Sequence, residues 1–169
     1  EELVLFSNRL TGPVPEALGD CEALMVCHLG YNDLQDQLPN ALGKLARLEC
    51  LRADHNQLTG AIPTELGQLS PALLWLHLDN NKLTGAITTE LGQLSAKLQR
   101  LYLHHNQIRV IENMEFHPDL RVLSINNNQI EELAALLCLT RLEYLNASSN
   151  KIAQVDEADL PPSLLHLNL

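Results

Sequence analysis

Apolar residues recur along this chain in a fixed pattern, Leu-x-x-Leu-x-Leu-x-x-Asn-x-Leu, in which other apolar residues sometimes replace leucine. Within each copy the apolar positions alternate with polar ones, which predicts a short strand with one buried face and one wet face. Seven copies reach their asparagines, which lie 22 to 25 residues apart at Asn8, Asn32, Asn56, Asn81, Asn106, Asn128 and Asn150, and the first of them lacks its opening leucine. An eighth copy starts at Leu164 and runs to the last residue.

The spacing of the copies predicts how their strands pair. A period of 22 to 25 residues leaves room for one strand and one return segment, but not for a hairpin. Successive strands are therefore expected to run parallel and to stack about 4.8 Å apart. The asparagine that ends each strand carries two amide donors and one acceptor, and we expect it to satisfy backbone groups buried in the turn.

These residues resemble the leucine-rich-repeat family over essentially the whole chain. The resemblance implies an α/β fold, a right-handed leucine-rich-repeat solenoid or horseshoe with a concave parallel β-sheet. Its convex side is expected to consist of extended segments, 3-10 turns and short helices. Residues 1–169 are expected to form a single solenoid, with about seven full repeats and a truncated eighth, that is part of a longer chain.

The return segments are of two kinds. Residues 1–106 carry Thr-Gly pairs after the strand, at Thr11-Gly12, Thr59-Gly60 and Thr84-Gly85, and look like the plant-type LTGxIP subclass with repeats of 24 to 25 residues. Residues 107–169 lack that signature, and their 22-residue repeats are similar to the short intracellular subclass found in a phosphatase regulatory subunit and in ciliary proteins. The strand phase is unbroken at the changeover, so no linker is predicted.

Composition excludes several classes of partner. Leucine accounts for 38 of the 169 residues and asparagine for 14, and both counts follow from the repeat. The net charge of −10, with 11 basic against 21 acidic residues, argues against binding to nucleic acid, which needs clustered lysine and arginine. The sequence contains no run of about 18 apolar residues, so no membrane contact is expected from this segment.

Four cysteines bear on the cellular compartment. Cys27 replaces a strand leucine, and Cys21 falls at an expected core position of a return segment. Cys138 lies in the apolar run Leu136-Leu137-Cys138-Leu139, and Cys50 lies in a strand. Free buried cysteines favour an intracellular protein, although a disulfide between Cys21 and Cys27 is not excluded by the spacing. The sequon at Asn146 lies mid-strand on the wet face, where a glycan would obstruct binding, so we interpret it as a chance occurrence.

The wet face of the sheet, called the open face below, has an unusual composition. From the repeat phase, six of the seven histidines and five of the six aromatic residues fall on it, but only three of the 21 acidic residues do. Protein interfaces are depleted in charge and enriched in tryptophan, tyrosine and arginine. We therefore predict a partner-binding patch centred on Trp75, His77, Arg100, Tyr102 and His104, with Arg52, Asp54, Asp79 and His105 around it.

Metal binding and catalysis are not expected on the open face. Parallel strands should project Asp54, Asp79 and His104 outward without convergence, so neither a metal site nor another cofactor is predicted. Asp79 beside His104 should favour the imidazolium form of that histidine. A triad of Ser124, His104 and Asp79 would span two strand steps and would lack an oxyanion donor, so we expect no catalytic residues.

The sequence therefore predicts a non-catalytic scaffold for protein–protein interaction. The resemblance of its short repeats implies a cytoplasmic protein, in one version a subunit of a ciliary, flagellar or axonemal assembly. The alternative is an extracellular ligand-recognition ectodomain of a plant-type receptor or receptor-like protein. In a third version the segment targets an enzyme whose catalytic domain lies elsewhere in the chain. The partner and the oligomeric state are not readable from the sequence.

Overall fold

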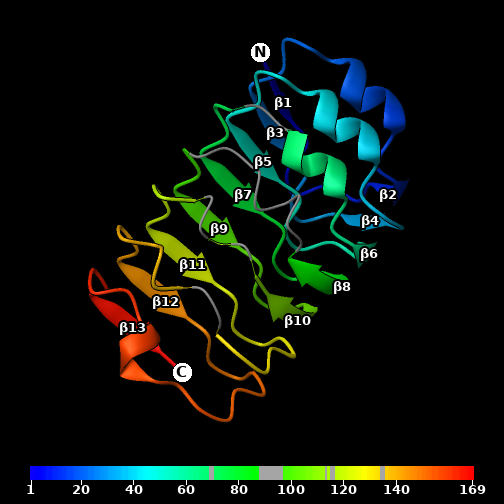
Figure 1. Cartoon of the computed structure of the whole chain (residues 1–169). Coiled ribbons are helices and arrows are strands. Elements are labelled where there is room, and N and C mark those ends of the chain that lie inside the picture. Colours follow the sequence, from blue (N-terminus) through cyan, green and yellow to red (C-terminus); the bar gives the residue numbers. More distant parts are fainter. Residues whose placement is uncertain (69–70, 88–96, 113, 115–116, 134–135) are drawn as a thin grey trace.

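The computed structural model describes residues 1–68, 71–87, 97–112, 114, 117–133 and 136–169 (Figure 1). Among these residues, one strand from each repeat joins an eight-stranded parallel sheet in the order β1-β3-β5-β7-β9-β11-β12-β13. The strands are β1 (Glu2–Val4), β3 (Val26–His28), β5 (Cys50–Arg52), β7 (Trp75–His77), β9 (Arg100–Tyr102), β11 (Val122–Ser124), β12 (Tyr144–Asn146) and β13 (His166–Asn168). The leucine-rich-repeat solenoid that the sequence predicts is confirmed.

Register along the sheet follows the repeat. Cys50 pairs with Trp75, Trp75 with Arg100, and Arg100 with Val122, so equivalent positions of successive repeats lie side by side. Two residues further along each strand, Arg52 pairs with His77 and His77 pairs with Tyr102, which gives a second row on the open face. No register shift occurs within this sheet, including at the change of repeat type. Residues at the same position of successive repeats therefore lie side by side in the structure, as the repeat phase predicts.

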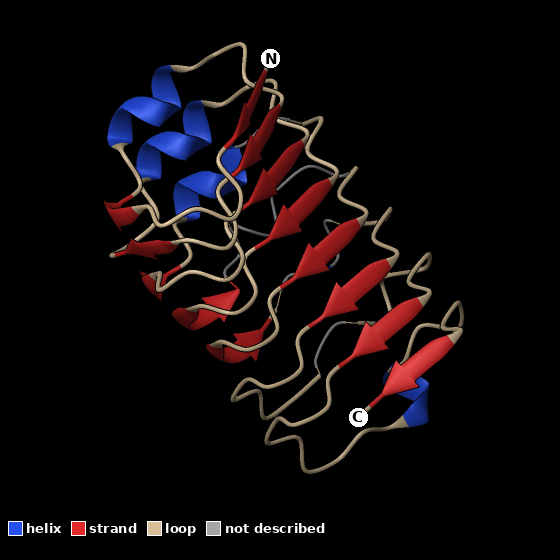
Figure 2. Ribbon diagram, turned by 180° about the vertical axis from the view of Figure 1, so that it is seen from behind, coloured by secondary structure: helices blue, strands red, loops and turns tan. Residues whose placement is uncertain are grey.

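The return segments build the rest of each coil. Strands β2 (Thr11–Pro13) and β4 (Asp33–Gln35) pair with each other, and β6 (Thr59–Ala61), β8 (Lys82–Ile87) and β10 (Gln107–Ile111) form a second small sheet. The helical segments described are all 3-10 helices: η1 (Glu16–Asp20), η2 (Asn40–Lys44), η3 (Thr64–Gln68) and η5 (Glu157–Asp159). Figure 2 shows η1, η2 and η3 side by side and the small strands beyond them, all set apart from the main sheet.

Close stacking of the 3-10 helices depends on glycine. A Cβ atom added to Gly43 of η2 would lie 2.2 Å from the carbonyl oxygen of Glu65 in η3. One added to Gly19 of η1 would lie 2.1 Å from the carbonyl oxygen of Ala41 in η2. Neither distance is compatible with a side chain, so the Leu-Gly pairs at Gly19 and Gly43 allow these coils to stack closely on the back of the molecule.

Leucine fills the space between the sheet and the return segments. The middle residue of each central strand points inward and is almost completely buried: Leu51, Leu76, Leu101, Leu123 and Leu145. Burial of each such side chain stabilises the fold by about 1.5–3 kcal/mol. Because every coil contributes the same apolar positions, the core is one continuous column through the described coils.

The predicted asparagine ladder is confirmed. Asn106 Nδ2 donates to the carbonyl oxygens of Leu78 and Leu103, both at 3.0 Å, and its Oδ1 accepts from Leu83 N at 2.9 Å. The equivalent three bonds are made by Asn32, Asn56, Asn81, Asn128 and Asn150. Asn8 differs, because its amide donates only to carbonyls of its own coil, those of Leu5 and Phe6.

The residue before each ladder asparagine has a left-handed backbone. The φ angles at these positions lie between 51° and 56° in Ser7, Tyr31, His55, Asn80, His105, Asn127 and Ser149. Only a few per cent of non-glycine residues adopt this region. The conformation turns the chain out of the strand and, as described below, directs three of these side chains, those of Tyr31, His55 and His105, onto the open face.

One expectation about the core was wrong. Cys21, expected at a core position, is exposed, whereas its counterpart Leu45 in the next coil is fully buried. Both residues directly follow a 3-10 helix, η1 for Cys21 and η2 for Leu45, so the same position of the repeat differs in exposure between these two coils. Cys27 and Cys50 are buried, Cys138 is partly buried, and all four cysteines are free thiols. Within the described part of the chain, no helix has the length and hydropathy needed to cross a membrane.

Candidate partner-binding face

Aromatic rings on the open face are held by contacts with one another. His77 stacks on Tyr102 with ring centroids 4.4 Å apart, and Tyr31 stacks on His55 at 3.9 Å. The guanidinium of Arg100 lies over the Trp75 ring, 5.7 Å from its centroid. Trp75 is still 41% exposed, so its ring is oriented by a neighbour and remains available to a partner.

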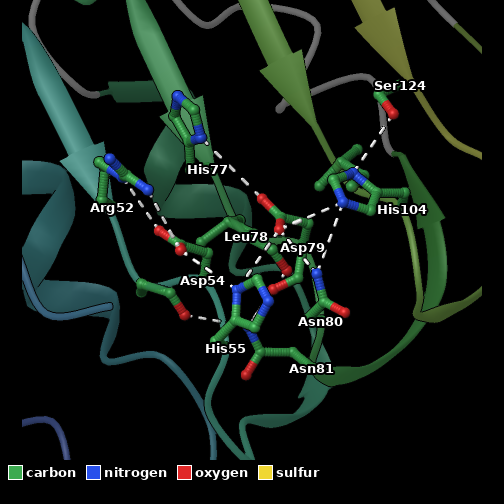
Figure 3. A network of polar contacts seen from close by, with 12 residues as sticks. Arg52, Asp54, His55, His77, Leu78, Asp79, Asn80, Asn81, His104 and Ser124 are labelled. Carbon is green, nitrogen blue, oxygen red and sulfur yellow. Dashed lines mark hydrogen bonds and ion pairs between the residues drawn. The ribbon is translucent and has the colours of Figure 1, made fainter. Parts of the chain in front are cut away.

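Asp54 is not a solvent-facing residue, contrary to the expectation from the repeat. Its exposed fraction is 2%, and Arg52 donates to it twice, from Nε to Oδ1 at 3.1 Å and from Nη2 to Oδ2 at 3.3 Å. His55 Nδ1 lies 3.3 Å from the same Oδ2 (Figure 3). The carboxylate therefore anchors Arg52 and His55 and is itself covered by them.

Asp79, one strand further on, is also buried, with an exposed fraction of 5%. Asn80 Nδ2 donates to its Oδ2 at 2.9 Å, and His104 Nε2 lies 3.3 Å from the same oxygen. His55 Nδ1 is 3.8 Å from Oδ2, and His77 Nδ1 is 3.9 Å from Oδ1. Figure 3 shows Asp79 in the middle of these groups, so the two aspartates position three residues of the predicted patch, Arg52, His77 and His104.

Burial favours the neutral form of His77 and His104. It lowers the pKa of His77 to about 4, with a further decrease from the charge of Arg52, and the opposing effects of Asp79 and Asp54 are smaller. The pKa of His104 is also lowered, because burial outweighs the neighbouring Asp79. Asp79 favours the imidazolium form of His104 as expected, but burial has the larger effect, so the net shift of the pKa is toward the neutral ring. For Arg52, burial opposes the charged form, but hydrogen bonds and charge of Asp54 leave its pKa raised.

Metal-ligand atoms come closer together than parallel strands would suggest. One donor atom from each of Asp54, His55 and Asp79 lies within 4.8 Å of the other two. The left-handed backbone of His55 brings its ring back over both carboxylates, which the strand pattern did not predict. Asp54 is already engaged by the guanidinium of Arg52, so a metal ion would have to displace a cation that is in place.

Ser124, His104 and Asp79 form a connected chain of polar contacts. Ser124 Oγ lies 3.2 Å from His104 Nδ1, and His104 Nε2 lies 3.3 Å from Asp79. The hydroxyl of Ser124 also donates to Asn126 Oδ1 at 2.9 Å, and Ser124 is only 6% exposed.

Three backbone N–H groups close to this chain of contacts are engaged in the sheet. The N–H groups of His105, Ile125 and Asn127 all donate to carbonyls of the next coil at 2.9–3.0 Å. These three groups are therefore not available as hydrogen-bond donors to a substrate oxygen beside Ser124.

Sequence reasoning placed Phe6, Tyr31 and Tyr144 on the open face but left them out of the patch. Their exposed fractions, 44%, 45% and 37%, are similar to that of Trp75. Phe6 contacts Tyr31 edge-on at 5.1 Å, so an aromatic ladder extends from the first coil to His55. The repeat phase places these three rings on the open face in the same way as Trp75, so the sequence alone could have included them in the patch.

Comparison with protein families gives two matches that share one description. A model described as leucine rich repeat matches residues 96–152, and a second with the same description matches residues 47–69 and 72–94. Together the matched ranges take in more than half of the chain. A search of curated proteins finds no match.

Similar solved structures come from plants and bacteria. The plant peptide hormone receptor RGFR1, solved in complex with RGF2, is 34% identical with a TM-score of 0.81, over 87% of this chain and 24% of that one. The Arabidopsis receptor kinase HAESA, solved with the peptide hormone IDA and the co-receptor SERK1, is 28% identical with a TM-score of 0.81, over 89% of this chain and 26% of that one.

A bacterial protein has the same fold at lower identity. An internalin from Listeria monocytogenes is 22% identical with a TM-score of 0.83, over 99% of this chain and 47% of that one. The present chain spans about a quarter of the length of the plant receptors that it matches.

Proposed function

Because the chain belongs to the leucine-rich-repeat family, we propose that it is a non-catalytic scaffold that binds a protein partner on its open face. The coiled sheet presents side chains from successive repeats in straight rows, which suits it to an extended contact surface. Protein or peptide partners are named for the RGFR1 and HAESA structures, which supports the same kind of ligand here.

The observation that carries the proposal is a set of exposed rings on one face of the sheet. Trp75, Tyr31, Phe6 and Tyr144 are each more than a third exposed, and contacts with neighbouring residues orient them. Rigid aromatic groups lose little conformational entropy when a partner covers them, and they are enriched among residues that dominate binding energy. The proposed contact set is Trp75, His77, Arg100, Tyr102, His104 and His105.

The two acidic residues have a different role in this proposal from the one predicted. Asp54 and Asp79 are too deeply buried to meet a partner directly. They hold Arg52, His55, His77 and His104 in place through the contacts described above. Removal of either carboxylate should therefore disturb the patch through its positioning and not through a lost contact.

The test is affinity purification of partners with the wild-type protein and with a Trp75→Ala/Tyr102→Ala variant, followed by mass spectrometry. A matched control, Val110→Ala/Leu137→Ala, removes apolar groups that are 46% and 53% exposed but lie outside the open-face rows. Partners that are lost with the first variant and kept with the second support the proposal. The reverse result would place the binding surface elsewhere and reject it.

We infer further that the protein acts inside the cell, as part of a cytoplasmic or ciliary assembly. Four free thiols, two of them buried, are typical of a reducing compartment. The short repeats of residues 107–169, which resemble an intracellular subclass, point the same way. Microscopy of the tagged full-length protein is the direct test, and a signal confined to the cell surface or medium would contradict this location.

The second candidate is the ligand-recognition ectodomain of a plant-type receptor. The specific observation in its favour is the likeness of the chain to the plant receptor RGFR1, at 34% identity over 87% of its residues. Expression through a secretory pathway separates the two candidates, because an ectodomain should fold and stay soluble there. The sequon at Asn146 can be glycosylated in that pathway, and a glycan there would lie on the open face and block binding of a partner.

A further inference from the structure

A hollow on the open face lies over strands β9, β11 and β12. Its volume is about 700 Å³. The side chains that matter for its chemistry are those of Arg100, Tyr102, His105, Asn126, Tyr144 and Asn146. It adjoins Trp75 through Arg100, so it continues the proposed contact surface toward the later coils.

The two asparagines present donors to this hollow. Asn126 Oδ1 accepts a hydrogen bond from Ser124 Oγ at 2.9 Å, and Asn146 Oδ1 accepts from the backbone N and Oγ of Ser148 at 3.2 and 2.8 Å. Their amide oxygens are thus occupied within the protein. Neither Nδ2 group has a hydrogen-bond acceptor among the residues that the structure describes, so four N–H bonds remain for a ligand.

Arg100 adds a formal positive charge at the edge of the hollow. It is exposed, and it forms no ion pair with any described residue. Its guanidinium is oriented by the Trp75 ring at 5.7 Å, a contact that leaves the planar N–H groups free to bind. A guanidinium fits the two oxygens of a carboxylate in a bidentate arrangement.

Among the residues that the structure describes, no acidic side chain lines the hollow. The nearest acid in the network, Asp79, is 5% exposed and is engaged by Asn80 and His104. This is unusual for a protein of net charge −10, in which acidic residues outnumber basic ones by 21 to 11. A surface with a cation, amide donors and phenol groups but no acid is complementary to a negatively charged ligand.

We propose that this hollow binds carboxylate side chains from an acidic segment of the partner protein. The inference rests on the proposed function and adds the chemistry of the partner. A carboxylate would accept from Arg100 and from the amide groups of Asn126 or Asn146, while Tyr102 and Tyr144 would contact the apolar part of the segment. Nucleic acid is a poorer fit, because its phosphates need several clustered cations and Arg100 is the one exposed arginine or lysine that lines the hollow.

The test compares two labelled octapeptides by fluorescence anisotropy, one of alternating glutamate and tyrosine and one of alternating glutamine and tyrosine. The glutamate peptide is expected to bind about tenfold more tightly than the glutamine peptide, because a hydrogen bond to a charged group contributes more binding free energy than one to a neutral group. Arg100→Gln should abolish that preference. Arg109→Gln, which makes the same change in charge at an exposed residue of β10, should keep it.

A second measurement reports on the site directly. In nuclear magnetic resonance spectra, the side-chain amide signals of Asn126 and Asn146 should shift with the glutamate peptide and not with the glutamine peptide. Equal binding of the two peptides, no binding of either, or an equal loss in both arginine variants would overturn the inference. If the cellular partner depends on Trp75 and Tyr102 but not on Arg100, this inference fails and the proposed function stands. If the partner depends on neither, both fail.

Discussion

The side-chain oxygen of Asn106 accepts a hydrogen bond from the backbone N–H of Leu83, 23 residues earlier and one coil away, at 2.9 Å. The same amide donates to the carbonyls of Leu78 and Leu103, which directly follow the neighbouring strands β7 and β9. All of these groups are buried, so they depend on one side chain for their hydrogen bonds. This makes Asn106 a cross-link between coils rather than an ordinary turn residue.

We therefore expect Asn106→Ala to destabilise the fold strongly. The variant leaves the N–H of Leu83 and the carbonyls of Leu78 and Leu103 buried without this partner. The unpaired N–H should cost about 1–3 kcal/mol, and each carbonyl that keeps another hydrogen bond should cost less. A loss of about 3 kcal/mol in the free energy of unfolding is predicted from urea denaturation. Asn8→Ala is the control, because Asn8 bonds only to its own coil at an exposed position, and it should cost less than about 1 kcal/mol. Equal losses in the two variants would show that the link between coils contributes little.

Acid should weaken the fold through His77. Its pKa in the folded state is lowered to about 4, below the usual 6.5, so the unfolded chain binds protons more readily between these two values. Stability contributed by the neutral ring is complete above pH 6.5 and is lost as the pH falls toward 4. The loss should be roughly 2–3 kcal/mol.

The measurement is the urea midpoint of the wild type and of His77→Gln as a function of pH. Carboxylates also titrate toward the lower end of this range, so the difference between the two proteins isolates the histidine. The variant should lose less stability than the wild type on acidification. Parallel curves would mean that His77 titrates normally in the folded protein.

Thiol reactivity should separate Cys21 from Cys27. Burial raises the pKa of Cys27 to about 12, whereas Cys21 is exposed. Since the thiolate is the reactive form, iodoacetamide at about pH 8 should label Cys21 in the folded protein and reach Cys27 only after unfolding. Peptide mass spectrometry reads both sites, and Cys21→Ser should remove the early product. Fast labelling of Cys27 in the native protein would contradict the packing of β3 against the core.

Ser124 should not react as a serine nucleophile. Although it contacts His104, its side chain is buried and its proton is directed to Asn126, and the adjacent N–H groups are engaged in the sheet. Incubation with a fluorophosphonate probe is expected to give no adduct at this residue, as judged by intact mass. An adduct that appears in the wild type and is absent from Ser124→Ala would establish an activated serine and would require a catalytic function.

The sequence predicted the rows of the open face residue by residue, because a strand has a fixed period and the repeat fixes its phase. Trp75, Arg100 and Val122 lie side by side as expected. It did not predict the burial of Asp54 and Asp79. That burial depends on the left-handed turn at His55 and on contacts between neighbouring rows, which no single repeat contains.

The direction of the pKa shift of His104 could not be predicted from the sequence either. Proximity of Asp79 to His104 was expected correctly, but the sign of the pKa shift depends on how far burial offsets that charge. The exposure of Cys21 was missed for a related reason, since the same position is buried in the next coil at Leu45. Periodicity identifies which side a residue faces, whereas solvent exposure depends on what its neighbours cover.

The asparagine ladder also has an evolutionary consequence. Because each ladder asparagine from Asn32 to Asn150 completes its hydrogen bonds with its own coil and the one before it, duplication or deletion of one whole repeat would leave the same set of bonds between the coils that then adjoin. The gene can therefore lengthen or shorten the protein in steps of one strand. Each added strand brings new open-face positions that are free of the core and the ladder, so recognition can diverge while the architecture is inherited unchanged.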